Sequence, residues 1–132
     1  MIVRPDIAAR CLSGEVRAIP RPFRQGDCIV ALKEPGDTDL RLVEVWRNER
    51  RWLRVGATVA IQPGRTRAVG HVTVTGLEDM PFLEVTDQDA KAMGYRDRPA
   101  FLAAWLDICG GVEAFDPLGR LVVLHVRPVG LN

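Results

Sequence analysis

The stretch LRVGATVAIQPGRTRAVGHVTVTGLEDMP, residues 53–81, carries the clearest fold signal in the chain. Thr58 to Ile61 and Gly70 to Thr75 are rich in β-branched residues, and in the second run valines alternate with polar residues, as in a half-buried strand. Val55-Gly56-Ala57 and Pro63-Gly64 lie between the runs and supply residues that tolerate a positive φ or fix φ for a turn. The stretch therefore predicts short strands separated by tight turns.

Strand signals continue on both sides of this stretch. Cys28 to Leu32 and Arg41 to Trp46 have strand character upstream, and four or five strands at this spacing predict a sheet that curls into a barrel. Downstream, Leu121 to Val126 is almost wholly apolar, which is typical of a strand buried on both faces. We therefore expect this last run to lie in the centre of the sheet.

Helices are expected around these strands. The first runs from Pro5 to Ser13, with a proline in its first turn and Gly14 as its stop. Thr86 to Asp89 form a capping box that opens a short helix, and Asp97 caps a longer one with an apolar face. The sequence thus predicts an α+β, β-dominant fold, a pseudobarrel of about five to six strands with two to three short helices.

Composition limits the class of protein. With 132 residues the chain is sized for a single domain, residues 1–132, and its 47% apolar and 27% charged residues match the globular average. No stretch approaches the roughly 20 apolar residues of a membrane span. The three widely spaced cysteines form neither a CxxC pair nor a zinc pattern with the two histidines. We therefore expect a cytoplasmic protein with reduced thiols, no membrane partner, no metal and no cofactor.

The charges are distributed unevenly along the chain. Residues 1–67 hold 12 Arg and one Lys against eight acidic residues, whereas residues 68–132 hold four Arg and one Lys against nine. A basic face and an acidic face are therefore expected. Of the 18 basic residues, 16 are Arg, which suits phosphate and base recognition, although a GC-rich genome raises the arginine content in the same way.

Arginine and proline alternate just after the first predicted helix. Pro20 and Pro22 hold the segment extended, and Arg17 and Arg21 are an even number of residues apart, so their side chains should share one face. Such a pair is suited to gripping a phosphate or stacking on a base. The alternative is a solvated edge strand that charge and proline protect from aggregation.

The segment WRNERRWLR, residues 46–54, interleaves Trp46 and Trp52 with arginines that include Arg50. Aromatic planes beside guanidinium groups are typical of proteins that bind single-stranded nucleic acid. A hairpin tip with inward tryptophans and solvated arginines is the alternative. A short basic loop with Arg65 and Arg67 follows, and these two residues are expected to follow the backbone of a bound strand.

Signals for catalysis are sparse. The chain has one serine, no paired carboxylates at a telling spacing and no phosphate-cradling glycine loop. His71 is a weak candidate for a general base beside Thr73, and Glu44 is a further weak candidate for proton transfer. A hydrogen-bonded structural histidine is the alternative at position 71.

In their order, these segments resemble the ASCH family of the PUA-like superfamily, from about Ile2 to Val129. Residues 53–81 and the following EVTDQDAKAMGYRDRPAFLAAWLDI, residues 84–108, are similar to the ASCH stretch in which a barrel strand leads to a "DA..xGF" helix and an "F...W" helix. The matching residues are Asp89-Ala90, Gly94-Tyr95, Phe101 and Trp105. The resemblance implies a PUA-like pseudobarrel.

The family signature, G-x-K-x-x-E-x-R, follows the first helix and faces the cleft thought to bind the ligand. Here the stretch runs from Gly14 to Arg21, which both match, while Val16 and Ile19 replace the lysine and the glutamate and Arg17 lies one residue past the lysine position. Some relatives hydrolyse acylated cytidine through a lysine, a threonine and a glutamate. The resemblance therefore implies a binding cleft more than this hydrolysis, and it leaves nuclease activity open.

Together, the arginines and the resemblance predict a domain that binds RNA or a nucleotide-like ligand in a basic cleft between the first helix and the barrel. Arg17 and Arg21 would contact phosphate or a base edge there, and Trp46 or Trp52 would stack a base. Two alternatives stay open, because a fold does not fix a function. One is a hydrolase acting on RNA or a modified nucleoside, and the other is a protein-interaction module, with a homo-oligomer among its forms.

Overall fold

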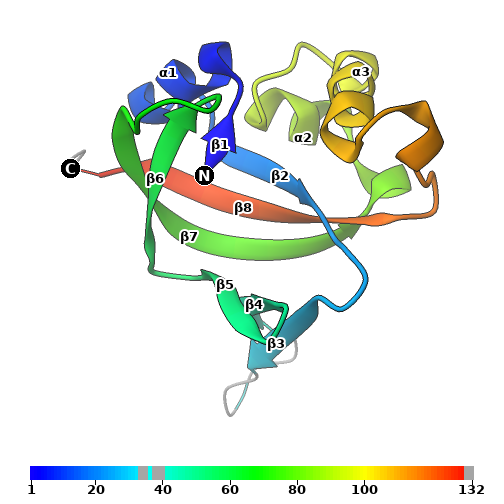
Figure 1. The fold of residues 1–132 in the computed structure, drawn as a ribbon, viewed down its shortest axis with the longest axis horizontal. Coiled ribbons are helices and arrows are strands. Elements are labelled where there is room, and N and C mark those ends of the chain that lie inside the picture. The colour runs from blue at the N-terminus through cyan, green and yellow to red at the C-terminus, as the bar shows by residue number, and fades with distance from the viewer. Residues whose placement is uncertain (33–35, 37–40, 130–132) are drawn as a thin grey trace.

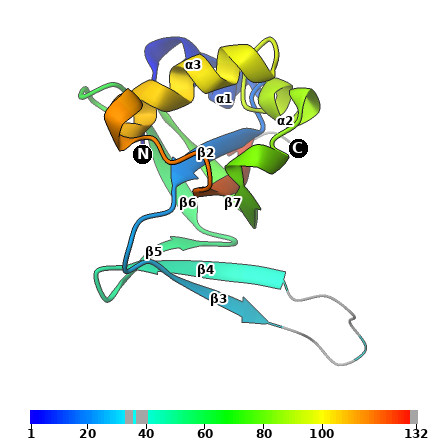
Figure 2. The ribbon, with the colours of Figure 1, turned by 90° about the vertical axis from the view of Figure 1, so that its right-hand side faces the viewer.

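The computed structural model describes residues 1–32, 36 and 41–129. Helices gather at one end of the molecule and a small sheet lies at the other, with a larger curved sheet between them (Figures 1 and 2). The described residues form these strands and helices in chain order: β1 (Ile2–Val3), α1 (Pro5–Ser13), β2 (Ala18–Pro22), β3 (Cys28–Leu32), β4 (Arg41–Arg47), β5 (Arg50–Arg54), β6 (Thr58–Pro63), β7 (Gly70–Pro81), α2 (Asp87–Ala92), α3 (Arg98–Cys109) and β8 (Arg120–Pro128).

The strands form two separate sheets. The larger sheet has the order β1-β6-β7-β8-β2, and the smaller sheet has the order β3-β4-β5. β1 runs parallel to β6, and the other pairs are antiparallel. Asn48 and Glu49 join β4 to β5 with positive φ values of 53° and 62°, which is the conformation of a tight hairpin turn that matches the twist of its strands.

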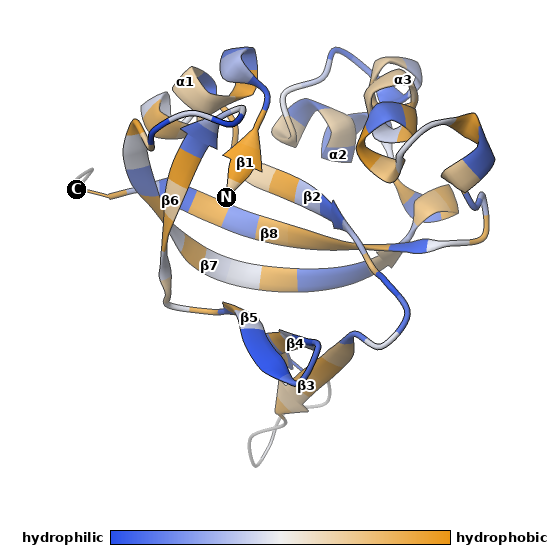
Figure 3. Cartoon of the chain, viewed as in Figure 1, coloured by the Kyte–Doolittle hydropathy of each residue, from blue (hydrophilic) through white to orange (hydrophobic). Residues whose placement is uncertain are grey.

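β8 is an interior strand of the larger sheet, between β7 and the edge strand β2. Its residues alternate between two hydrophobic cores: Val122 and Leu124 pack with α1 and the smaller sheet, whereas Leu121 and Val123 pack with α2 and α3. Figure 3 shows the contrast between this largely hydrophobic strand and the hydrophilic β5. The prediction of a last strand buried on both faces is confirmed.

β2 forms an edge of the larger sheet, beside β8. The carbonyl of Arg17 and the N–H of Phe23 both bond to the β8 side, so the intervening Pro20 and Pro22 turn their nitrogens to the outer edge. Proline has no N–H to donate, and an edge position is where a strand tolerates it. The outer edge of β2 is therefore closed to pairing with a further strand.

The predicted fold class is confirmed: the fold is α+β with β dominant. The first helix has the predicted bounds, and the predicted capping box is present, with reciprocal bonds between Thr86 and Asp89. The described residues form eight strands, more than the five to six predicted, and they lie in two sheets that do not close into one barrel, which is consistent with the predicted pseudobarrel. Within this part of the chain, no helix is both long and apolar enough to cross a bilayer.

Candidate functional site

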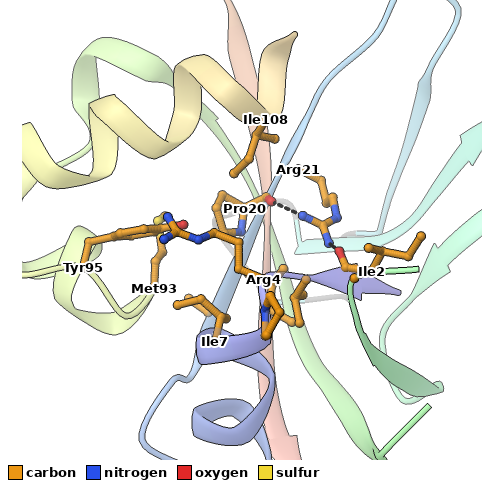
Figure 4. Close-up of a pocket in the computed structure, with 13 residues that line it drawn as sticks. Ile2, Arg4, Ile7, Pro20, Arg21, Met93, Tyr95 and Ile108 are labelled. Atoms are coloured by element: carbon orange, nitrogen blue, oxygen red, sulfur yellow. Dashed lines mark hydrogen bonds between the residues drawn. The ribbon is translucent and has the colours of Figure 1, made fainter. Parts of the chain in front are cut away.

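A cavity of about 390 Å³ opens between the start of α1, β2 and the turn after α2 (Figure 4). This volume lies in the range of small-ligand sites, about 300–1,000 Å³. The walls are mainly apolar, and they include Ile2, Ile7, Pro20, Met93 and Ile108. Ligand pockets commonly combine such walls with a few placed polar groups, and here those groups are Arg4, Arg21 and Tyr95.

Arg21 supplies a positive charge at one wall of the cavity. One of its terminal nitrogens donates to the carbonyl of Pro20 at 3.0 Å, and the other donates to the carbonyl of Ile2 (Figure 4). Among the described residues, no carboxylate forms an ion pair with Arg21. Its guanidinium is therefore held in place by backbone carbonyls and keeps its full charge for a ligand.

Burial also shifts the protonation equilibrium of this arginine. Removal from water lowers the pKa of Arg21 below its ordinary value, and the nearby Tyr95 and Cys11 act in the opposite direction. Arginine stays protonated in proteins despite such a shift. The site thus holds a cation that lacks part of its hydration, and a bound anion would replace that hydration.

Tyr95 and Arg4 form the opposite wall, where the long side chain of Arg4 extends toward the Tyr95 ring (Figure 4). Burial raises the pKa of Tyr95, while the positive charges of Arg4 and Arg21 lower it in part. Arg4 also pairs with Asp6 at 3.5 Å, with both side chains well exposed. A flat ring, two cations and apolar side chains therefore surround the same space.

A close approach between α1 and the turn after α2 positions Tyr95 at the wall of the cavity. Gly94 has a φ of +99°, and a Cβ at this position would lie 2.8 Å from side-chain atoms of both Ile7 and Val16. Only glycine fits this conformation and this space without strain. Arg10 fixes the approach by donating to the carbonyl of Gly94 at 2.8 Å.

The basic loop after β6 borders the same cavity through Gly64. The N–H of Gly64 donates to the carbonyl of Val3 at 2.8 Å, and Thr66 closes the loop by donating to the carbonyl of Pro63 at 2.9 Å. Arg65 and Arg67 are exposed on this loop. The structure therefore brings two of the predicted arginines to a loop at the rim of the cavity that holds Arg21.

The Trp46–Arg54 segment lies elsewhere, on the β4–β5 hairpin at the end opposite the helices (Figures 1 and 2). Trp52 is half-buried beneath Arg47, and Trp46 is exposed, with its indole N–H 3.5 Å from Glu44. A separate shallow hollow of about 540 Å³ adjoins Trp52 and the exposed Arg50. The hairpin is thus a second surface, distinct from the cavity.

The remaining candidates do not line the cavity. Arg17 is exposed just before β2, and its backbone N–H donates to Ala92 at 2.9 Å; Gly14 ends α1 with a φ of 84°. His71 and Thr73 lie on β7 and pair with β6, whereas Glu44 lies on β4 in the other sheet and pairs with Arg51. The structure therefore does not gather the three catalytic candidates at this cavity.

Of the residues that line the cavity, only Arg21 was proposed as a site residue from the sequence; Arg4, Met93, Tyr95 and Ile108 are among those that were not. Arg4 and Arg21 are 17 positions apart, and no periodicity connects them. The one available signal was Gly94-Tyr95, because a glycine between a short helix and the only tyrosine of the chain indicates a tight turn that presents an aromatic ring.

Comparison with known proteins gives one solved structure of similar fold. No protein-family model matches the sequence, and no curated protein is similar enough to match it. The chain is similar to the crystal structure of protein EF3133 from Enterococcus faecalis V583, described under the family model DUF984, with a TM-score of 0.63 and 17% identity. The match covers 94% of this chain and 70% of that one. At this identity, the likeness shows that the two chains share a fold.

Proposed function

We propose that this chain is a PUA-like domain of the ASCH type that binds RNA or a nucleotide-like ligand in the cavity between α1 and β2. The observation that carries the proposal is Arg21, a half-buried cation without a carboxylate partner among the described residues, on the wall of a largely apolar cavity. Phosphate is an anion whose geometry matches the paired N–H donors of arginine.

Two signature positions and the location of the cavity support the ASCH assignment. Arg21 occupies the last position of the resembled signature and lines the cavity. Gly14 occupies the first position and ends α1 in the left-handed conformation. The cavity itself lies beside the first helix, where the resemblance leads us to expect the cleft.

The arrangement suits a nucleotide with its phosphate at Arg21. The base would lie among the apolar side chains of Ile7, Met93 and Ile108, with Tyr95 as an aromatic surface for stacking. Arg65 and Arg67 on the rim loop would then follow the backbone of a longer strand, and Arg17 would add charge near the far end of β2. A cytoplasmic setting fits this role, since RNA is abundant there and the three cysteines are free thiols.

The two residues that differ from the family signature favour binding over hydrolysis. Val16 is 0% exposed and Ile19 is 2% exposed, and both belong to the hydrophobic core beneath α1. A lysine at position 16 would place a charge in that core at a large cost, and Ile19 presents an apolar side chain to the cavity where the signature has a carboxylate. The chemistry that the resembled hydrolases use therefore has no counterpart at these two positions.

The test is the affinity of the chain for a short, fluorescently labelled single-stranded RNA, followed by anisotropy at two salt concentrations. Replacement of Arg21 by alanine should weaken binding about tenfold and reduce the salt slope by about 0.7, the contribution of one phosphate contact on a single strand. Arg127→Ala is the matched control, because Arg127 is exposed on β8 and does not line the cavity. Equal affinity of wild type and Arg21→Ala would refute the proposal.

A further inference from the structure

A second hollow, of about 200 Å³, adjoins the cavity. Ile108, near the end of α3, lines both spaces and forms the ridge between them. The second hollow is more polar than the first, and its lining includes Arg24, Asp116 and Arg120 together with the apolar Trp105. Taken alone, it is smaller than an ordinary ligand pocket, which starts at about 300 Å³.

The two spaces follow β2 in succession. Residues 18–21 line the cavity, and residues 22–24 line the second hollow. The outer carbonyls of this edge are already occupied, that of Pro20 by Arg21 and that of Pro22 by Arg47. Since proline nitrogens also cannot donate, an extended peptide would find no ladder of backbone bonds along this track. An elongated ligand must therefore be recognised by side chains.

The second hollow presents its own cation. Arg24 is exposed, and among the described residues its side chain forms no ion pair. Its backbone N–H is fixed by Asp27 at 2.9 Å, while the Asp27 carboxylate is bound by Arg47. Arg24 therefore projects from an anchored loop with its charge available.

The other charged residues of the hollow are less available. Arg120 is paired with Asp79 at 2.7 Å and 3.0 Å. The carboxylate of Asp116 accepts the N–H of Leu118 at 2.9 Å and adds a negative charge that opposes a phosphate. Arg24 thus favours an anion in this hollow, and Asp116 weakens that preference.

Resting on the proposed function, we infer that the natural ligand is a single strand of RNA at least two nucleotides long, rather than a free nucleotide. One nucleotide occupies the cavity, with its phosphate at Arg21. The chain of the ligand passes the Ile108 ridge, and the next phosphate lies against Arg24. The second hollow is then an extension of the first site, which is consistent with its small volume and polar lining.

The experiment compares each nucleoside 5′-monophosphate with the 5′-phosphorylated dinucleotide of the same base by calorimetric titration of the full chain. The dinucleotide should bind about tenfold tighter, with a salt slope steeper by about 0.7 for the added phosphate contact. Arg24→Ala should weaken dinucleotide binding about fivefold and leave the mononucleotide affinity unchanged. Alanine keeps the backbone N–H that anchors the loop, so this variant should fold normally.

Asp116→Asn is the opposing variant. Asparagine retains the oxygen that accepts the Leu118 N–H but removes the negative charge. It should strengthen dinucleotide binding about twofold and leave mononucleotide binding unchanged. Arg21→Ala, in contrast, should weaken the binding of both ligands.

The possible results separate the two proposals. Equal affinities for mononucleotide and dinucleotide, or an Arg24→Ala variant that keeps the full gain, would overturn the two-nucleotide inference and leave the proposed function intact. A chain that binds no mononucleotide, dinucleotide or longer single strand would overturn the proposed function itself.

Discussion

The guanidinium carbon of Arg47 lies 3.5 Å from the centroid of the Trp52 ring. The same guanidinium donates to both carboxylate oxygens of Asp27 at 2.9 Å and to the carbonyl of Pro22 at 3.0 Å. One side chain of the hairpin therefore connects the smaller sheet to the end of β2, the strand that carries Arg21. Arg47 is thus a structural tie between the two sheets.

Arg47→Ala should destabilise the fold strongly. The Asp27 side chain is 1% exposed, so removal of Arg47 leaves a buried carboxylate with the backbone N–H of Arg24 as its remaining bond, at a cost of about 3 kcal/mol. The measurement is the free energy of unfolding in urea at neutral pH. Arg54→Ala serves as the control, because Arg54 is exposed on β5 and should cost less than about 0.5 kcal/mol. Similar losses in the two variants would contradict the role given to Arg47.

The same pair predicts an acid dependence of stability. Burial alone would raise the pKa of Asp27, but the hydrogen bonds from Arg47 and Arg24 and their charges outweigh it and hold the pKa below its ordinary 3.8. A carboxyl whose folded pKa is depressed stabilises the fold above its unfolded pKa, and this stability is lost as the pH falls through the folded pKa. The stability difference between wild type and Asp27→Asn should therefore shrink as the pH drops below about 4. Urea unfolding of both proteins at a series of acidic pH values measures this difference in unfolding free energy. A difference that does not change with pH would count against the ion pair.

Gly94→Ala should damage both stability and the ligand site. The added methyl would lie 2.8 Å from Ile7 and Val16 at a φ of +99°, so the turn must shift and carry Tyr95 away from the cavity. We expect a loss of more than about 1 kcal/mol in unfolding free energy, together with weaker RNA binding. Gly56→Ala is the matched control, since Gly56 has a φ of +91° but nothing within 4 Å of an added Cβ. If Gly94→Ala lowers the unfolding free energy and the RNA affinity no more than Gly56→Ala does, the close approach at Gly94 does not hold the turn in place.

Local sequence signals predicted the elements that depend on neighbours in the chain. The Thr86–Asp89 capping box and the Gly14 stop require only residues within one helical turn, and both formed as expected. The alternation of β8 between two cores also follows from its own apolar run. β7, in contrast, continues to Pro81 beyond the predicted Thr75, because its register with β8 shifts between Val74 and Gly76 and pairing then resumes.

The division into two sheets could not be predicted in this way. It depends on which strands pair, and the pairing joins residues far apart in the chain, such as Ala18 of β2 with His125 of β8. Prediction of the site from the sequence has the same limit. Arg21 could be proposed because a signature contains it, but Arg4 and Ile108 reach the cavity only through tertiary packing.

Tyr95 gives a spectroscopic probe of the cavity, because it is the only tyrosine in the sequence. Burial raises its pKa above the ordinary 10.0, so the ultraviolet titration of the folded protein should have a midpoint above that of the urea-unfolded chain. The raised pKa stabilises the fold below pH 10 and this stability is lost as the pH rises through the folded value, a loss that Tyr95→Phe should remove. A folded midpoint at or below the unfolded one would show that the ring is solvated rather than part of the wall.

The three thiols should react in a fixed order. Cys28 is exposed, Cys109 is half-buried and Cys11 is buried, and burial raises the pKa of Cys11 to about 11, although Arg21 and Arg10 act against the shift. Because the thiolate is the reactive form, a thiol reagent at neutral pH should modify Cys28 first, Cys109 more slowly and Cys11 only on unfolding. Mass spectrometry of timed samples measures the order, with the urea-unfolded chain as the control in which all three react alike. Early modification of Cys11 in the folded protein would mean that α1 opens and exposes the core beneath Arg21.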